Sequence, residues 1–265
     1  MNTGVIIFAI NGDIKYTELA KEAARRVKQW LNLPTTLITD QTVNDPAFEQ
    51  VIVIDDVGQS STRFWADSQK KSHWFNAARS QALDLTPYDR TLLIDADYWI
   101  GNNNLLNIIN GTQPFACHRH AMNIYDEQVK IQKFSERNVD MWWATVCVFD
   151  KSAIVQDIFT AWKMIQHNYQ HYASLFNFTS RPFRNDYALS LALLLINGHE
   201  QPLWADLPWP LSNVTPECEI ELTDSEWNIR YQRMTNNELK TWRVSVSGID
   251  LHIMGKSNLE KICEG

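Results

Sequence analysis

The chain has 265 residues, of which 45% are apolar, and its 24 basic and 31 acidic side chains give a net charge of −7. With only 9 Gly and 9 Pro, this composition is typical of a globular protein and excludes a collagenous or disordered chain. The acidic balance gives no general attraction for DNA or RNA, because that attraction needs clustered Lys and Arg, but a local basic groove can coexist with a negative total.

Residue patterns in the first half of the chain alternate between strand and helix. Continuous apolar strands separated by amphipathic helices are typical of a mostly parallel sheet that helices cover, so we expect an α/β fold. In chain order the patterns predict a strand at 5–9, a helix at 19–31 ended by Pro34, strands at 35–38 and 51–54, a helix at 74–85 and a strand at 91–94.

The second half of the chain is less regular. A strand is predicted at 142–149, an amphipathic helix at 154–165 and a nearly all-apolar, deeply buried helix at 186–196. After a stretch rich in Pro and Trp, a final strand is predicted at 243–253. Because we find no internal repeat and no linker, we expect one α/β domain with an irregular C-terminal part.

Short apolar segments and dispersed cysteines indicate the cellular compartment of the protein. The most hydrophobic stretch, 188–196, is much shorter than the roughly 20 apolar residues of a membrane span. The apolar start at 4–10 has no basic residue before it and no cleavage site after it, so we interpret it as a strand rather than a secretion signal. The four cysteines form no C-x-x-C pair, which indicates neither a zinc site nor a disulfide scaffold. We expect a cytoplasmic protein without a membrane span.

Two carboxylates, Asp95 and Asp97, follow the apolar strand at 91–94. Ligands of α/β sheets bind at this end of the strands. Two acids this close resist joint ionisation unless a cation joins them, and Mg²⁺ or Mn²⁺ prefers such oxygen ligands together with phosphate oxygens. The triplet therefore indicates a divalent metal site, with a plain turn after the strand as the alternative.

The order strand, helix, strand and then an apolar strand ending in D-x-D resembles the nucleotide-sugar glycosyltransferases of the GT-A fold. One branch of them, glycosyltransferase family 8 with glycogenin and the lipopolysaccharide galactosyltransferases, is similar in three further features. These features are a basic residue, Arg79, on a helix sixteen positions before Asp95, an acid, Asp186, that opens a buried helix, and the pattern H-x-x-G at 252–255.

Two positions depart from the family's pattern. Tyr187 follows Asp186 where the family usually has Gln, and the lysine stands at Lys256 while the family's position here is Asn258. The resemblance implies one GT-A-like domain over 1–265, with a nucleotide-binding half at about 1–110 and an acceptor-side half at about 111–265.

The resemblance also implies the activity, a metal-dependent and retaining transfer of a sugar from a nucleoside diphosphate, most simply from a UDP-sugar. His252 would join Asp95 and Asp97 as the third ligand of Mn²⁺ or Mg²⁺, and Asp250 is a candidate to orient its ring. Asp186 would face the oxocarbenium-like transition state, as nucleophile or as electrostatic partner. Two simpler roles stay open, since His252 could be a core residue and Asp186 the acid of a helix N-terminus. Contacts to the nucleotide sugar are expected from Ala9, Asn11, Tyr16, Arg79, Asp95, Ala96, Asp97, Gly255 and Lys256.

The acceptor side has weaker signals. Tryptophans at 142, 143, 204 and 209 are candidates for a floor on which a sugar acceptor stacks, or for the core. His118, Arg119 and His120 are candidates for the acceptor side or for a solvated loop. A glycan, a lipid-linked sugar or a small molecule is the simplest acceptor, and a modified base in nucleic acid stays open.

Two other functions remain open as well. Phosphohydrolases of the haloacid dehalogenase type also place D-x-D after an apolar strand. In that family Thr or Val stands two residues after the second acid, where this chain has Trp99. The family also carries the motif near the first strand, whereas Asp95 here follows the strand at 91–94. A nucleotide-sugar or carbohydrate-binding protein without turnover is the third interpretation, because a fold alone does not establish catalysis.

Overall fold

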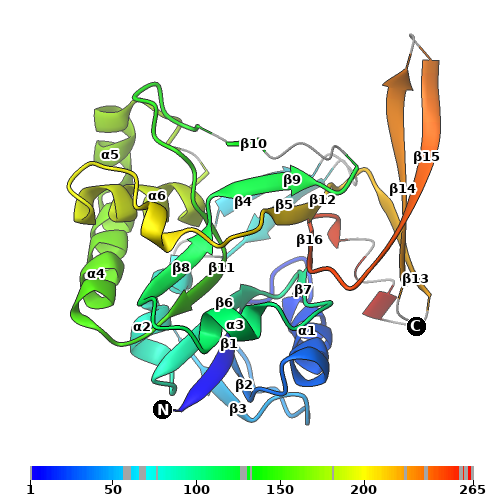
Figure 1. The fold of residues 1–265 in the computed structure, drawn as a ribbon, viewed down its shortest axis with the longest axis horizontal. Helices are drawn as coiled ribbons and strands as arrows, with labels where there is room; N and C mark the ends of the chain where they lie inside the picture. Colours follow the sequence, from blue (N-terminus) through cyan, green and yellow to red (C-terminus); the bar gives the residue numbers. More distant parts are fainter. Residues whose placement is uncertain are drawn as a thin grey trace.

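A six-stranded sheet forms the centre of the molecule (Figure 1). Its order is β3-β2-β1-β6-β11-β8, in which β1, β2, β3 and β6 run parallel while β11 runs antiparallel to both of its neighbours. The carboxyl ends of β1 and β6 therefore meet the amino end of β11 at one edge. The strands are β1 (Thr3–Ala9), β2 (Thr35–Thr39), β3 (Gln50–Val53), β6 (Arg90–Asp95), β8 (Phe115–His118) and β11 (Trp143–Phe149).

The structure is a computed structural model, which describes residues 2–55, 61–65, 70–75, 77–125, 130–131, 133–180, 182–223, 226–235, 238–256, 259 and 262–263. Among these residues, no helix is both long and apolar enough to cross a membrane.

Helices cover both faces of the central sheet, which confirms the predicted α/β class. One face packs against α1, and the other packs against α4 and α6. The helix α6 buries an unbroken run over 188–194, as its apolar sequence predicts. The α-helices are α1 (Tyr16–Trp30), α2 (Ala82–Leu85), α3 (Leu105–Ile109), α4 (Ala153–His167), α5 (Tyr169–Phe176) and α6 (Asn185–Ile196), and 3₁₀ turns occupy Ala77–Gln81 and Leu203–Ala205.

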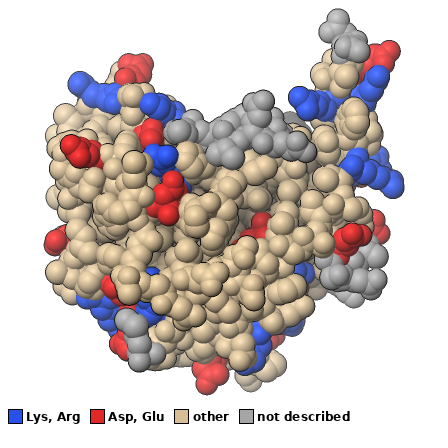
Figure 2. All heavy atoms as spheres, in the orientation of Figure 1, with Lys and Arg blue, Asp and Glu red and all other residues tan. Residues whose placement is uncertain are grey.

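A second, five-stranded sheet packs on the same core as α1. Its order is β10-β9-β12-β16-β7, and β12 runs parallel to β9 and β16. An antiparallel three-stranded sheet, β13-β14-β15, projects from the body of the molecule (Figures 1 and 2). A hairpin of β4 and β5 completes the strands. These strands are β4 (Ser61–Trp65), β5 (Lys70–Trp74), β7 (Tyr98–Trp99), β9 (His120–Asn123), β10 (Lys130–Ile131), β12 (Leu211–Val214), β13 (Glu219–Thr223), β14 (Glu226–Thr235), β15 (Glu238–Ser247) and β16 (Leu251–Ile253).

Three sequence predictions differ from the structure. The helix predicted over 74–85 is wrong in its first part, because Trp74 ends β5 and pairs with Ser61 of β4. The strand predicted over 243–253 is two strands of different sheets, because the chain turns between them at Gly248, whose φ of +64° is left-handed. The C-terminal part predicted to be irregular is built from β12 to β16.

Candidate active site

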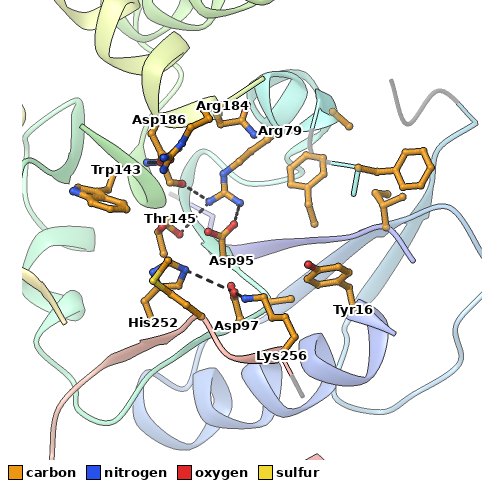
Figure 3. A pocket seen from close by; sticks show the side chains of 18 of the residues that line it. Tyr16, Arg79, Asp95, Asp97, Trp143, Thr145, Arg184, Asp186, His252 and Lys256 are labelled. Atoms are coloured by element: carbon orange, nitrogen blue, oxygen red, sulfur yellow. Dashed lines mark hydrogen bonds and ion pairs between the residues drawn. The ribbon is translucent and has the colours of Figure 1, made fainter. Parts of the chain in front are cut away.

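A pocket of about 300 Å³ lies where the ends of β1, β6 and β11 meet (Figure 3). The switch from parallel to antiparallel pairing beside β6 opens the sheet edge at this point, which is where ligands of α/β sheets bind. The walls come from segments far apart in the chain. Its lining consists of Phe8, Ile10, Tyr16, Phe75, Ala78, Arg79, Asp95, Ala96, Asp97, Trp143, Ala144, Thr145, Arg184, Asn185, Asp186, Pro216, His252, Met254 and Lys256.

Asp95 and Asp97 point into this pocket from the end of β6 and the turn that follows it (Figure 3). Asp95 accepts from the guanidinium of Arg79, which also donates to the backbone carbonyls of Ala144 and Thr145. Because three acceptors hold Arg79, its positive charge is fixed beside the first carboxylate. Such pairing offsets the free-energy cost of placing a charge away from water.

Asp97 is the more buried of the two acids, at 6% exposed. The Lys256 ammonium contacts its Oδ2, and the same oxygen lies 3.7 Å from Nε2 of His252. Lys256 also donates to the carbonyl of Ile253 at 3.2 Å. One carboxylate oxygen thus faces both a cation and an imidazole.

His252 comes from β16, more than 150 residues after the two acids, yet it completes their group. One ligand atom each from Asp95, Asp97 and His252 lie within 4.8 Å of one another. Nδ1 of His252 lies 2.9 Å from Oδ1 of Asn213. When this nitrogen donates its N–H to the Asn213 oxygen, the lone pair of Nε2 faces Asp97. Two carboxylates and one imidazole oriented in this way suit a divalent cation.

The prediction that Asp250 orients His252 is wrong, because Asn213 occupies that place. Asp250 instead accepts from the hydroxyl of Tyr98 at 2.9 Å and from the backbone N–H of Gly101 at 2.8 Å. Burial raises the pKa of Asp250, and these two donors oppose the rise. Asp250 therefore connects the start of β16 to β7 and positions His252 only indirectly.

Asp186, the candidate catalytic acid, lines the pocket from the first turn of α6. Its Oδ1 accepts from the backbone N–H of Ala144 at 3.0 Å, and its Oδ2 accepts from Nη2 of Arg184 at 2.9 Å. Burial acts to lower the pKa of Arg184, but the Asp186 carboxylate outweighs it and the pKa is raised. Asp186 thus holds α6 to β11 and brings Arg184, which the sequence did not indicate, into the pocket.

The nucleotide contacts expected from β1 and the segment after it divide into two groups. Tyr16 lines the pocket, whereas the Ala9 side chain is buried in the core and its neighbours Phe8 and Ile10 form the lining. Side chains alternate between the faces of a strand, so these neighbours face the opposite way from Ala9. Asn11 accepts from the backbone N–H of Thr17 and donates to its hydroxyl, both at 3.0 Å, at the start of α1. Among the other predicted contacts, Arg79, Asp95, Ala96, Asp97 and Lys256 line the pocket, and Gly255 is buried beside it.

Of the four tryptophans that were candidates for stacking on a sugar acceptor, one lines the pocket. Trp143 lines the pocket, but Trp142 points to the opposite core, as successive strand residues do. Trp209 packs at the margin of the core, and Trp204 is exposed.

The three candidates that end β8 and begin β9 also lie outside the pocket lining. His118 is fully buried, with Nδ1 2.9 Å from the carbonyl of Trp209, and Nε2 has no hydrogen-bond partner among the described residues. Burial lowers the pKa of His118 to about 4. Arg119 and His120 lie near Asp206, at 3.4 and 3.7 Å.

Comparisons with known proteins find similarity in shape only. No family model and no curated protein matches this chain. Solved structures that match include the glycosyltransferase GlyE of Streptococcus pneumoniae TIGR4, with 13% identity and a TM-score of 0.42, and its apo form, with 12% and 0.41. Each match covers 76% of this chain and 45% of the other, so the chain spans less than half the length of these structures. Similarity at this level assigns no role to a residue, and the chemistry has to follow from the pocket itself.

Proposed function

We propose that this protein is a metal-dependent glycosyltransferase that moves a hexosyl group from a nucleoside diphosphate, with a UDP-sugar as the donor, to an acceptor bound at the same pocket. The observation that carries this proposal is the convergence of Asp95, Asp97 and His252 at the carboxyl edge of the sheet. Mg²⁺ and Mn²⁺ in such oxygen-rich sites share their shell with phosphate oxygens. A resident divalent cation would supply Lewis-acid stabilisation of the leaving diphosphate.

The other side chains of the pocket fit a donor of this kind. Lys256 can turn its ammonium toward the diphosphate, where negative charge grows as the sugar leaves. Tyr16, Phe8 and Ile10 offer an apolar wall for the base and ribose. On the opposite side Asp186 presents a carboxylate beside the place for the sugar, which suits the electrostatic role in a retaining transfer.

Asp186 is better suited to electrostatic stabilisation than to nucleophilic attack. Each of its oxygens already accepts a hydrogen bond, one from the N–H of Ala144 and one from Arg184. Donors of this kind lower the basicity of a carboxylate and fix its position. The cellular compartment we propose is the cytoplasm, because all four cysteines are free thiols.

A thermal-shift screen tests this function. The purified protein is heated with UDP, GDP, CDP or ADP and with their sugars, each with and without Mn²⁺, because a ligand of the native state raises the melting temperature. A rise that requires both the metal and one nucleotide supports the proposal and identifies the base. The screen also includes inorganic phosphate with Mg²⁺, and a rise with this pair alone would favour a phosphohydrolase. The absence of any rise would contradict the donor site. If donor binding is found but neither transfer nor hydrolysis follows, the protein is a binding protein without turnover.

A further inference from the structure

The antiparallel sheet β13-β14-β15 is an insertion between two strands of the five-stranded sheet, which carries His252 of the pocket. It begins after β12 and returns before β16, and these two strands pair in parallel. Its two ends are close in sequence to Pro216 and His252, both of which line the pocket. We call the two long strands, Glu226–Thr235 and Glu238–Ser247, the arm; Figure 1 shows it rising away from the body.

Large side chains fix the base of the arm. Trp227 and Ile229 are buried in the core, and the Arg26 guanidinium lies 4.8 Å from the Trp227 ring. Further out, the Tyr231 ring stacks on Tyr125 with 4.6 Å between centroids. The outer half of the arm, beyond Tyr231, is largely exposed to solvent. The arm is therefore anchored in the core at its base and projects into solvent over its outer half.

Basic side chains lie directly opposite one another across the arm. The strand register pairs Arg230 with Arg243 and Arg233 with Lys240. Like charges in directly opposite positions destabilise a sheet, so such pairs are expected where an anion neutralises them. Figure 2 shows blue, basic side chains along the projection, although the whole chain carries −7. Four of the six charged side chains of the arm are basic, the acidic two being Glu226 and Glu238.

Neighbouring acids neutralise only part of this charge. Glu219 lies 3.2 Å from Arg230, and Glu238 lies 3.6 Å from Lys240, with all four side chains well exposed. Arg233 and Arg243 form no ion pair with a described residue. Exposed pairs of this kind contribute little, so two to four cations are available to a partner.

The two basic pairs point to opposite faces of the arm, because positions 230 and 233 are an odd number of residues apart. A partner that neutralises both must therefore present negative charge on two sides. A membrane surface or a single strand presents it on one side, whereas the two phosphate strands that border a groove of a duplex present it on both. The major groove of B-DNA, about 12 Å wide, admits a two-stranded β-ribbon, and the narrow major groove of duplex RNA does not.

We propose that the arm docks in the major groove of double-stranded DNA, with Arg233 and Arg243 on the phosphates. The outermost apolar pair, Met234 opposite Leu239, is 61% and 62% exposed and would contact base edges, such as thymine methyl groups. Trp242, 46% exposed opposite Tyr231, adds an aromatic surface for the DNA backbone. Duplex binding by the arm stands apart from the transfer reaction, whereas the duplex as carrier of the acceptor group rests on the proposed function.

Fluorescence anisotropy with a labelled duplex tests the proposal without donor or metal. The full-length protein is titrated at several salt concentrations, next to Arg233→Gln/Arg243→Gln and a control, Arg25→Gln/Lys28→Gln, in which the two exposed cations are on α1. We expect the arm variant to bind at least about tenfold more weakly near 0.1 M salt, with the slope of log K against log salt shallower by about 2. The control should bind like the wild type. Equal melting temperatures of all three proteins establish that they are folded.

Four results would overturn the proposal. The first is that the wild type does not bind the duplex, and the second is that the arm variant and the control lose the same affinity for it. The third is that the slope of log K against log salt is unchanged in the arm variant. The fourth is that the protein binds single strands, duplex RNA or anionic vesicles more tightly than duplex DNA. Binding of UDP with Mn²⁺ is measured on the same proteins. If the wild type binds the duplex but not UDP with Mn²⁺, the donor site is wrong and the arm proposal stands. If it binds UDP with Mn²⁺ but not the duplex, the arm proposal is wrong and the donor site stands.

Discussion

Acidification should destabilise this protein through His118, which β8 holds in the core. The ring is fully buried and its pKa is lowered from 6.5 to about 4, chiefly by burial and further by the charge of His252, while the Trp209 carbonyl acts in the opposite direction. Between these two values the unfolded chain binds a proton at this histidine and the native protein does not. The free energy of unfolding therefore falls as the pH falls from 6.5 toward 4. A difference of roughly 2.5 pKa units corresponds to about 3 kcal/mol.

Urea unfolding between pH 7 and pH 4 measures this loss. His118→Asn keeps an N–H donor for the Trp209 carbonyl and removes the titration, so its stability should fall by about 3 kcal/mol less than that of the wild type over this range. His171→Asn, on the exposed side of α5, is the control and should follow the wild type. Identical pH profiles for the wild type and His118→Asn would refute the reasoning.

Substitutions at Asn213, Lys256 and Gly101, with matched controls, test the frame of the pocket. Asn213→Leu removes the acceptor at His252 Nδ1 and should weaken Mn²⁺ binding by roughly 10–100-fold in a calorimetric titration. Asn213→Asp keeps an acceptor and should bind Mn²⁺ within a few-fold of the wild type. An equal loss of affinity in both variants would contradict the role of Asn213 in orienting His252. Lys256→Met frees Asp97 Oδ2 of its cation and should strengthen the binding of Mn²⁺ alone while weakening that of UDP, and an unchanged metal affinity would show that Lys256 does not compete. Gly101→Ala would bring a Cβ within 2.0 Å of the carbonyl oxygen of Ile249 and should lower the free energy of unfolding in urea by about 3 kcal/mol. Gly111→Ala, where the nearest oxygen is 3.2 Å away, should lower it less. A loss under about 1 kcal/mol at Gly101 would contradict the close packing of this turn.

Five of the six strands of the central sheet could be predicted from the sequence because they are apolar runs. The strands β1, β2, β3, β6 and β11 and the helices α1, α4 and α6 follow local periodicity, and the structure confirms them. Most of the arm could not be predicted in this way, since only 243–247 at the end of β15 lies within a predicted strand. Both faces of its outer half meet solvent, so no alternation of apolar and polar residues marks its strands.

Residues of the candidate site could be predicted where a short motif carries them, and not where they depend on a contact between distant segments. Asp95 and Asp97 stand together in the sequence, and the H-x-x-G pattern indicated His252. The partner of His252 depends on the parallel register that places Asn213 of β12 beside it, which no local pattern encodes. Arg184 was missed for a similar reason, since its place in the pocket follows from the contact between Asp186 and β11.

Direct titration of Mn²⁺ by calorimetry, with and without UDP, tests the central claim that Asp95, Asp97 and His252 form the metal site of a nucleotide-sugar enzyme. The account predicts one ion per chain, tighter binding when UDP is present, and loss of the ion in Asp97→Asn at an unchanged melting temperature. Asp157→Asn, an exposed acid on α4, should bind as the wild type does. Equal Mn²⁺ affinity in the wild type and Asp97→Asn, or binding that UDP does not change, would contradict it.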